Sequence, residues 1–390
     1  MKHYVITGGA GLLGSQLISS LQKNGDFTKC VVIDPTPYRP FDTIKLDTSF
    51  VEYIQVSSKI DSVSYTYSIQ GSFLDETVLN RVLSNCVTVF HLCAIGHTGR
   101  FGAQKYKSRA HQFNVLGTIQ LIKKCKENGV QRFIYSSSIA VVFTGKPLYS
   151  CNEAEPYPKQ SEYLDIYSST KAEAESFILS QSCLDFKTTC LRFRAIYGPQ
   201  DVSVAEKVVN MVRKNLFMVK ISRHDHESIS NMSSAENCGQ AFHLANQVLA
   251  EQNGPHGQAY FITDGETVGQ YEVWSPLIRA LGKTPPVHSV PYPIVSAFVS
   301  ISSFFCYEIF HSSPPMTRFE LETLVTDNTY SIEKAEKELG YVPGKNHFKK
   351  TVDYYRIQPI QSTTHNFGSW FNFDTLLFMI LIIFWTIISF

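Results

Sequence analysis

The chain has 390 residues, and its 35 lysines and arginines nearly balance 34 acidic residues, for a formal net charge of +1. A chain of this length can bury a large core without disulfides or structural metals, and its balanced charge argues against nucleic acid as a partner. The nine cysteines include no C-x-x-C pair, which is typical of reduced thiols in a reducing compartment. The set His224, Asp225, His226 and Glu227 is interpreted as a polar surface loop, and we expect no metal site.

The first 34 residues predict one strand–turn–helix–strand unit. Residues 3–7 (HYVIT) are typical of a buried strand, and the glycine-rich residues 8–14 follow at once. Residues 12–21 carry apolar side chains at helical spacing, and residues 30–34 (CVVID) form the next buried strand. The whole unit has the length that a parallel crossover connection needs.

Strands and helices continue to alternate along the chain. This alternation predicts an α/β fold with a doubly wound parallel sheet of the Rossmann type. Strands are expected at residues 67–70, 88–92, 132–136 and 187–192, and helices at 75–84, 114–128 and 163–181. We expect the dinucleotide-binding domain at residues 1–198, completed by a strand near 258–263, and a substrate lobe of mostly helices and loops at 199–365, closing with a helix near 332–339.

The C-terminal end of the chain is strongly apolar. Residues 375–390 (TLLFMILIIFWTIISF) carry no charge, and as a helix they would reach ~24 Å, against ~30 Å for a hydrocarbon core. We expect residues 366–390 to anchor the chain to a membrane; a buried core helix is the alternative. The basic residues upstream favour a catalytic domain on the cytosolic side. A second apolar stretch at 291–310 is equally typical of an interfacial helix and of core.

The glycines of residues 7–14 (TGGAGLLG) have G-x-x-G-x-x-G spacing. Gly8 is expected to allow the tight turn, Gly11 the approach of a pyrophosphate, and Gly14 the close packing of helix and sheet. The exposed N–H groups of the first helical turn, which begins at Leu12 and Leu13, would bind the phosphates. With a strand before it and a helix after it, this pattern predicts a dinucleotide site.

Asp34 ends the second strand, twenty residues beyond Gly14. A carboxylate at this position accepts hydrogen bonds from the adenosine ribose and disfavours a 2′-phosphate, which selects NAD over NADP. The alternative role is an aspartate that opens the turn before Pro35. Arg39 lies nearby and leaves some use of NADP open.

Tyr167 and Lys171 have the i, i+4 spacing that places two side chains on one helix face. A neighbouring ammonium and a positive nicotinamide ring would lower the pKa of the tyrosine by roughly 2–3 units and let it act as a base. Three serines precede this helix at the end of a strand, where open α/β sheets bind ligands. Ser138 is the best placed of them to bind the substrate oxygen, whereas Ser136 and Ser137 are interpreted as a plain strand end.

Together these segments resemble the extended short-chain dehydrogenases/reductases of the 3β-hydroxysteroid dehydrogenase/isomerase family, closest to its orphan family-42E branch. The resemblance covers almost the whole chain and is carried by TGGAGLLG, TVFHLCAIG (88–96), NVLGT (114–118), RFIYSSS (132–138), the Y-x-x-x-K pair and LRFRAIYGP (191–199).

The resemblance implies a role for individual residues. Tyr167 would accept the proton, Lys171 would bind the nicotinamide ribose and tune Tyr167, and Ser138 would hold the substrate oxygen. Asn114 would order a proton-relay water, with a helix N-cap as the equally supported alternative. The backbone of Ala94 to Gly96 would line the cofactor.

Three positions depart from the family pattern. Ser72 follows Gly71 where relatives carry an aspartate that contacts the adenine. Phe193 stands where relatives carry a proline, which puts the loop beside the nicotinamide in doubt. Residues 233–236 (SSAE) replace a valine-histidine-valine-aspartate-like stretch of the second lobe.

The sequence thus predicts NAD-dependent oxidation of a secondary alcohol on a sterol-like apolar substrate, at the endoplasmic reticulum membrane, with double-bond isomerisation left open. Membrane lipid is an expected partner, and a homodimer is a candidate assembly. Two enzyme alternatives share the fold: a decarboxylating sterol 4-carboxylate 3-dehydrogenase, and a sugar-nucleotide epimerase, against which the apolar stretch 291–310 argues. A non-catalytic NAD-binding membrane scaffold is the alternative of another class.

Overall fold

The computed structural model describes residues 2–26, 28–36, 41–55, 75–96, 103–309, 314 and 316–358. Four sequence predictions concern positions outside the described residues: the strand at 67–70, the roles of Arg39 and Ser72, and the apolar tail 366–390.

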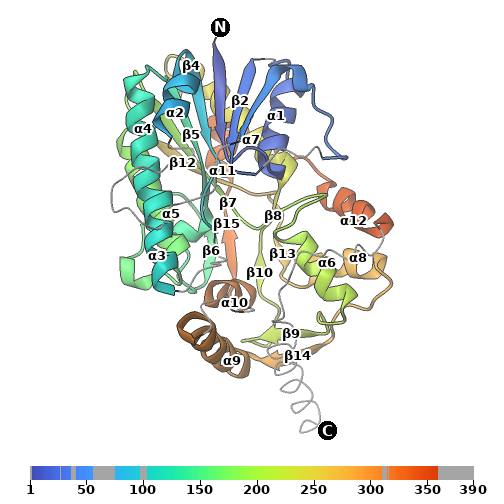
Figure 1. Ribbon diagram of the computed structural model, residues 1–390. Helices are drawn as coiled ribbons and strands as arrows, with labels where there is room; N and C mark the ends of the chain where they lie inside the picture. The colour runs from blue at the N-terminus through green and yellow to red at the C-terminus, as the bar shows by residue number, and fades with distance from the viewer. Residues whose placement is uncertain are drawn as a thin grey trace.

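Within the described residues, a seven-stranded sheet forms the centre of the molecule, with the order β12-β7-β5-β4-β1-β2-β3 (Figure 1). Every neighbouring pair is parallel, which confirms the predicted Rossmann-like α/β fold. The strand predicted near residues 258–263 is β12, and it joins the sheet beside β7. The strands are β1 (His3–Thr7), β2 (Lys29–Asp34), β3 (Val51–Gln55), β4 (Cys86–His91), β5 (Arg132–Ser138), β7 (Lys187–Phe193) and β12 (Gln258–Ile262).

Helices cover both faces of this sheet (Figure 1). One face carries α2 (Glu76–Leu83), α3 (Ala103–His111), α4 (Gly117–Glu127) and α5 (Ile166–Ser180). The other carries α1 (Leu12–Lys23), α7 (Ala235–Ala250) and α11 (Glu333–Leu339). Each face has its own apolar core, because strands buried on both sides present apolar residues in both directions. Helix α3 was not predicted, because its sequence (AQKYKSRAH) is mostly polar and shows no clear apolar face.

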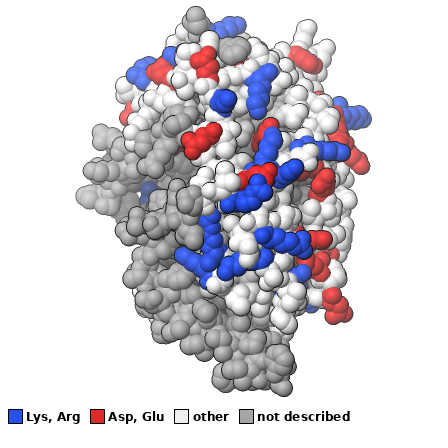
Figure 2. Space-filling view, turned by 90° about the vertical axis from the view of Figure 1, so that its right-hand side faces the viewer, with Lys and Arg blue, Asp and Glu red and all other residues white. Residues whose placement is uncertain are grey.

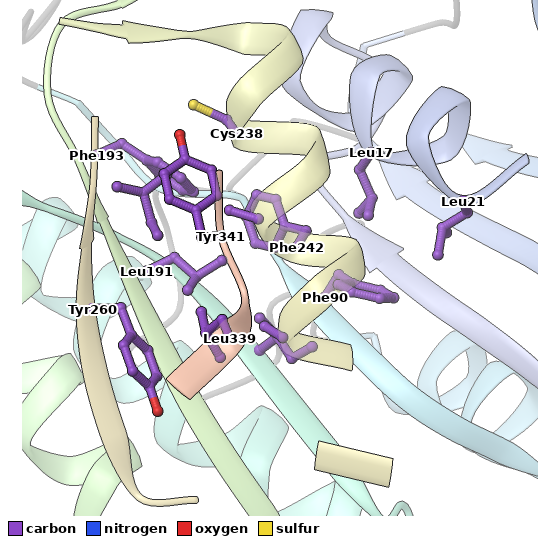
Figure 3. Packing of buried hydrophobic residues seen from close by; sticks show 14 of the residues in the cluster. Leu17, Leu21, Phe90, Leu191, Phe193, Cys238, Phe242, Tyr260, Leu339 and Tyr341 are labelled. Carbon is purple, nitrogen blue, oxygen red and sulfur yellow. The ribbon is translucent and has the colours of Figure 1, made fainter. Parts of the chain in front are cut away.

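Phe193 lies in the core beneath α7 (Figure 3). Its ring centroid is 5.3 Å from that of Phe242, and only 3% of the residue is exposed. Strand β7 therefore continues regularly through Phe193, the position at which the family resemblance leads us to expect proline. The departure from the family pattern fills core volume and leaves the strand intact.

Outside the central sheet lie short strands that the sequence analysis did not predict; all but β6 (Leu148–Cys151) and β8 (Ile196–Tyr197) belong to the second lobe. A four-stranded sheet has the order β13-β10-β15-β6, and β14 pairs with β9. These strands have only two to four residues each, too short for an alternating pattern to show. The strands are β6 (Leu148–Cys151), β9 (Val219–Ser222), β10 (Ile229–Ser230), β13 (Val268–Gly269), β14 (His288–Pro291) and β15 (Asn328–Tyr330); β8 (Ile196–Tyr197) pairs with β11 (Ser233–Ser234). The helices are α6 (Ala205–Arg213), α8 (Ser275–Ala280), α9 (Tyr292–Phe304), α10 (Arg318–Val325) and α12 (His347–Ile357).

Most of the apolar stretch 291–310, namely Tyr292–Ile309, forms a helix at the edge of this lobe (Figure 1). Helix α9 continues into a π-helical turn, Phe305–Ile309. One side of the helix, with Val295 and Val299, is buried in an apolar core. On the other side, 57% of Ile301 and 59% of Phe304 are exposed. By length and composition, Tyr292–Ile309 is the one helix among the described residues that could cross a membrane, which alone is weak evidence. The stretch is therefore part core and part apolar surface.

Basic and acidic side chains lie beside one another on the face seen in Figure 2. Glu236 of α7 accepts a hydrogen bond from Lys350 of α12 at 2.8 Å, and Lys23 of α1 lies 3.7 Å from the same carboxylate. These partly exposed pairs link three helices that are distant in sequence, and each adds little stability by itself.

A buried ion pair fixes helix α5 to the sheet. Arg192 on β7 donates to Glu175 on α5 from Nε at 3.0 Å and from Nη2 at 2.7 Å, and 3% and 0% of the two side chains are exposed. The Tyr157 hydroxyl donates to the same carboxylate oxygen at 2.7 Å. Removing one partner of such a pair leaves a buried charge without compensation.

We therefore predict that Arg192→Met lowers the free energy of unfolding by about 3–5 kcal/mol. The double variant Arg192→Met/Glu175→Gln, which removes both charges, should recover most of that loss. Urea unfolding followed by circular dichroism measures both. A single variant as stable as the wild-type protein would contradict the role given to this pair.

Candidate active site

The glycine-rich turn joins β1 to α1, and two of its glycines are required by close backbone contacts. Gly8 has a φ of +71°, and a Cβ there would lie 2.7 Å from the backbone of Cys93. A Cβ on Gly14 would lie 2.2 Å from the carbonyl oxygen of Gly9. Gly14 thus lets the first turn of the helix pack against the backbone of the glycine turn.

Gly11 differs from these two glycines, because a Cβ there would meet no atom within 4 Å. It precedes Leu12 and Leu13, the first residues of α1, whose N-terminus has no side-chain cap. Open space beside free helical N–H groups is the arrangement that a diphosphate needs. The turn therefore fits the predicted dinucleotide.

Asp34 lies at the end of β2 and is 8% exposed. One carboxylate oxygen accepts a hydrogen bond from the backbone N–H of Ala10 at 3.1 Å, and the other accepts one from Thr36 at 2.8 Å. The side chain thus joins the glycine turn to the turn before Pro35. The Asp34 carboxylate thus helps to form the turn before Pro35, and its contact with the adenosine ribose stays a prediction.

Asn114 lies within a continuous helical run, in the π-helical turn Gln112–Leu116 between α3 and α4, and does not cap a helix. Its side chain pairs with the backbone of Ile95: Oδ1 accepts from the N–H at 2.8 Å and Nδ2 donates to the carbonyl at 3.0 Å. Nδ2 also donates to the Thr170 hydroxyl at 3.0 Å. Asn114 therefore positions the loop of Ala94 to Gly96 against α5.

Tyr167 lies in the first turn of α5, whose N-cap is Asp165. It is partly exposed and packs beside the short helix Ile139–Val141 that follows β5. Burial raises the pKa of Tyr167 well above its usual value, and a hydrogen bond with Ser138 lowers it in part. The predicted pair of Tyr167 and Ser138 is therefore brought together, whereas the protein's own groups do not produce the expected fall in the pKa.

Lys171 lies one turn further along α5 and is 2% exposed. Its ammonium donates to the carbonyl oxygen of Ser136 at 2.7 Å and lies 4.3 Å from the centroid of the Tyr135 ring and 5.9 Å from that of Tyr167. Burial lowers the pKa of Lys171 to about 8. Ser136 therefore serves the site through its backbone, a role that its side-chain type could not reveal.

His91 is a member of this site that the sequence analysis missed. Its ring is buried between Thr7 of β1 and Thr118 of α4, with N···O distances of 2.7 and 3.0 Å. It stacks on Tyr135, with ring centroids 5.5 Å apart. Burial, with a smaller contribution from the Lys171 charge, lowers the pKa of His91 to about 3, so the imidazole is neutral. In the sequence, the one feature that could have indicated this role is the presence of a histidine within an otherwise apolar predicted strand, residues 88–92.

The altered segment 233–236 is well integrated in the fold. The Ser234 hydroxyl caps α7 by accepting from Asn237 N–H at 3.2 Å. The Ser233 hydroxyl accepts from the Arg194 N–H at 3.0 Å and donates to the Ile262 carbonyl at 2.6 Å. These serines tie the end of β7 to the second lobe.

In the cluster at residues 224–227, His226 and Glu227 contact other parts of the second lobe. His226 lies 3.5 Å from Asp327, and Glu227 accepts from the N–H groups of Tyr271 and Glu272 at 2.7 Å each. In the part of the chain that the structure describes, no group of three or more His, Cys, Asp or Glu side chains could hold a metal ion.

Comparison with known families decides how this site is classified. Residues 5–292 match the 3-beta hydroxysteroid dehydrogenase/isomerase family. The chain belongs to this family. It is accordingly an NAD-dependent oxidoreductase of the short-chain dehydrogenase/reductase type that acts on CH–OH groups.

Curated relatives include both branches that the motifs indicated. The chain is 33% identical over 293 residues to 3beta-hydroxysteroid dehydrogenase/Delta(5)-Delta(4) isomerase 1 of Caenorhabditis elegans; the match covers 75% of this chain but only 62% of that longer relative. It is 29% identical to short-chain dehydrogenase/reductase family 42E member 1 of Homo sapiens, over 97% of this chain and 94% of that one.

Solved structures with the same fold include sugar-nucleotide epimerases. UDP-glucose 4-epimerase from Thermotoga maritima, in complex with UDP-glucose, has a TM-score of 0.62 at 19% identity, covering 91% of this chain and 98% of that one. UDP-glucuronic acid 4-epimerase from Bacillus cereus, in complex with NAD, has a TM-score of 0.63 at 19% identity, covering 91% and 99%. At this identity the likeness shows the fold alone.

Gly14 and Gly11 should respond differently to the same small substitution. Gly14→Ala should lower the thermal unfolding temperature of the protein without cofactor, because its Cβ meets Gly9 backbone. Gly11→Ala should leave that temperature near the wild-type value but weaken NAD binding by ~10-fold, or about 1.4 kcal/mol. Differential scanning fluorimetry and titration calorimetry measure the two effects. Equal stability of the two variants would refute this account of the turn.

Proposed function

We propose that the protein oxidises a secondary alcohol on a sterol-like apolar substrate, with Tyr167 as the proton acceptor and NAD as the hydride acceptor. The observation that carries this proposal is the convergence of Ser138, Tyr167 and Lys171 at the end of β5. The hydrogen bond between Tyr167 and Ser138 places two oxygens where one alcohol oxygen can contact both.

NAD, when bound, supplies the acceptor for the hydride. The Ser138 hydroxyl holds the substrate oxygen, and the Tyr167 oxygen takes its proton. Since burial raises the pKa of Tyr167, the base needs nearby positive charge to act at neutral pH. Lys171, held in the next helical turn by the Ser136 carbonyl, would supply part of that charge, and the positive nicotinamide ring of bound NAD would supply the rest. Asn114 acts indirectly, by positioning the loop and helix on either side.

An apolar substrate is supported by the surroundings of the site. Tyr167 and Tyr163 pack against an apolar cluster that contains Phe143 and Phe319. The exposed apolar side of α9 lies on the same lobe. We propose that this side contacts membrane lipid, that residues 366–390 anchor the chain, and that the catalytic domain faces the cytosol at the endoplasmic reticulum. A sterol would then be met where it partitions.

The variant Tyr167→Phe tests the assigned base. Removing the phenol oxygen should lower the rate of NADH formation from 3-hydroxysterols by about 10²–10⁴-fold, because the proton then has no acceptor. NAD affinity, measured by calorimetry on detergent-solubilised protein, should stay within about twofold of the wild-type value.

The matched control is Tyr163→Phe, four residues earlier, whose hydroxyl donates to the Val141 carbonyl. It should keep most of the activity. Unchanged turnover in Tyr167→Phe would overturn the assignment, as would an equal loss in both variants.

A further inference from the structure

Glu175 lies one helical turn beyond Lys171 and continues the face of α5 that carries Tyr167 and Lys171. Side chains with this i, i+4 spacing are neighbours on a helix, with Cβ atoms about 5–6 Å apart. Glu175 is 0% exposed and Lys171 is 2% exposed. Because both are buried, water and salt screen the attraction between their charges much less than at the surface. The carboxylate is therefore close enough to act on the catalytic ammonium without touching it.

The ion pair with Arg192 uses only one oxygen of the Glu175 carboxylate. Oε1 accepts from Nε and Nη2 of Arg192 and from the Tyr157 hydroxyl. Oε2 is buried and accepts no hydrogen bond from the residues that the structure describes. An oxygen without donors keeps negative charge available to its surroundings, and a low local dielectric strengthens the effect. Fixing α5 to β7 does not account for this second oxygen.

Two thiols near Lys171 carry no negative charge at neutral pH. Burial lowers the pKa of Lys171, and the groups that oppose this fall among the described residues are Cys93, Cys190 and Glu175. However, burial raises the pKa of the Cys93 thiol to about 12 and that of the Cys190 thiol well above its usual value. Both thiols are therefore protonated, and of the three groups Glu175 supplies the negative charge.

The rings that surround the ammonium are uncharged as well. Burial raises the pKa of Tyr135 and of Tyr167 and lowers that of His91 to about 3. The Arg192 guanidinium on β7 is already paired with Glu175. Within the described ranges, Glu175 is thus the negative charge that acts on Lys171 near neutrality.

Lys171 depends on this charge because its pKa of about 8, which burial has lowered, is close to neutral pH. An opposite charge at such a distance shifts a pKa by roughly 1–3 units. Without Glu175, a further fall of even about one unit would leave much of Lys171 neutral. Tyr167 would then lose the ammonium that favours its phenolate.

We propose that Glu175 is a positioning residue of the active site, which acts on Tyr167 through Lys171 by keeping the Lys171 ammonium charged at neutral pH. The inference rests on the proposed function and extends the group of Ser138, Tyr167 and Lys171 by one residue. Arg192 then has two tasks, since it fixes α5 to β7 and holds Glu175 in its charged form through Oε1 alone.

Titration of the Lys171 side chain tests this without turnover. In protein that is isotope-labelled at the lysine Cε atoms, the Lys171 signal in NMR spectra is the one missing from Lys171→Arg, and its shift reports the loss of the proton. In Arg192→Met/Glu175→Gln, the midpoint should fall by roughly one pH unit. Loss of the Arg192 charge acts in the opposite direction, so a fall can come only from loss of Glu175.

Arg192→Lys is the matched control, because it keeps the ion pair without the guanidinium fork. Its stability should fall, whereas the Lys171 midpoint should stay near the wild-type value. The pH profile of kcat/KM should follow the titration: in the double variant, the loss of activity at alkaline pH should begin about one unit lower. Adding Lys171→Arg to the double variant should remove that difference, since a guanidinium keeps its charge at these pH values.

An unchanged Lys171 midpoint in the double variant would overturn the proposal. An equal fall in Arg192→Lys would overturn it too, by showing that lost packing is the cause. A wild-type Lys171 that titrates at the usual lysine value of about 10.4 would do so even if the double variant fails to fold, because it would need no partner. Each of these results, with NADH formation that still depends on Tyr167, leaves the proposed function standing. Turnover that does not depend on Tyr167 would contradict the proposed function, and the active-site role of Glu175 with it.

Discussion

The catalytic end of the sheet depends on one buried ammonium, that of Lys171. Among the described residues it has no carboxylate within hydrogen-bonding distance, and it is held by the Ser136 carbonyl and the face of the Tyr135 ring. Tyr135 stacks on His91, and His91 lies against Thr7, the last residue before the glycine turn. A single line of contacts thus crosses β5, β4 and β1. It joins the catalytic lysine to the turn that would bind the diphosphate, so the two halves of the site share one rigid frame.

Burial is costly for this lysine, and the fall of its pKa to about 8 expresses that cost. The ion pair of Arg192 and Glu175 fixes the same helix to β7. Functional sites commonly contain groups with shifted pKa values, because a catalytic group must have a pKa that suits its task. In the proposed mechanism that neighbour is Tyr167, whose own pKa burial has raised.

The sequence predicted the parts of the molecule that local patterns determine. The strand–glycine–helix unit is local in sequence, and the spacing of Tyr167 and Lys171 follows from the helix alone, so both were found. The carbonyl of Ser136 and the imidazole of His91 were missed, because their roles arise from neighbouring strands that the sequence does not order. Strand β3 at Val51–Gln55 and the short strands of the second lobe were missed because tertiary pairing, not periodicity, creates them.

The dependence of Tyr167 on the Lys171 charge is the central claim, and the pH profile of kcat/KM tests it most directly. In the wild-type protein, activity should rise with pH through the apparent pKa of the base. Lys171→Met removes the charge that stabilises the phenolate, so that rise should move to higher pH and activity near neutrality should fall. Lys171→Arg, which keeps a charge, should move it less. Profiles with the same midpoint in the wild-type protein and in Lys171→Met would contradict the account.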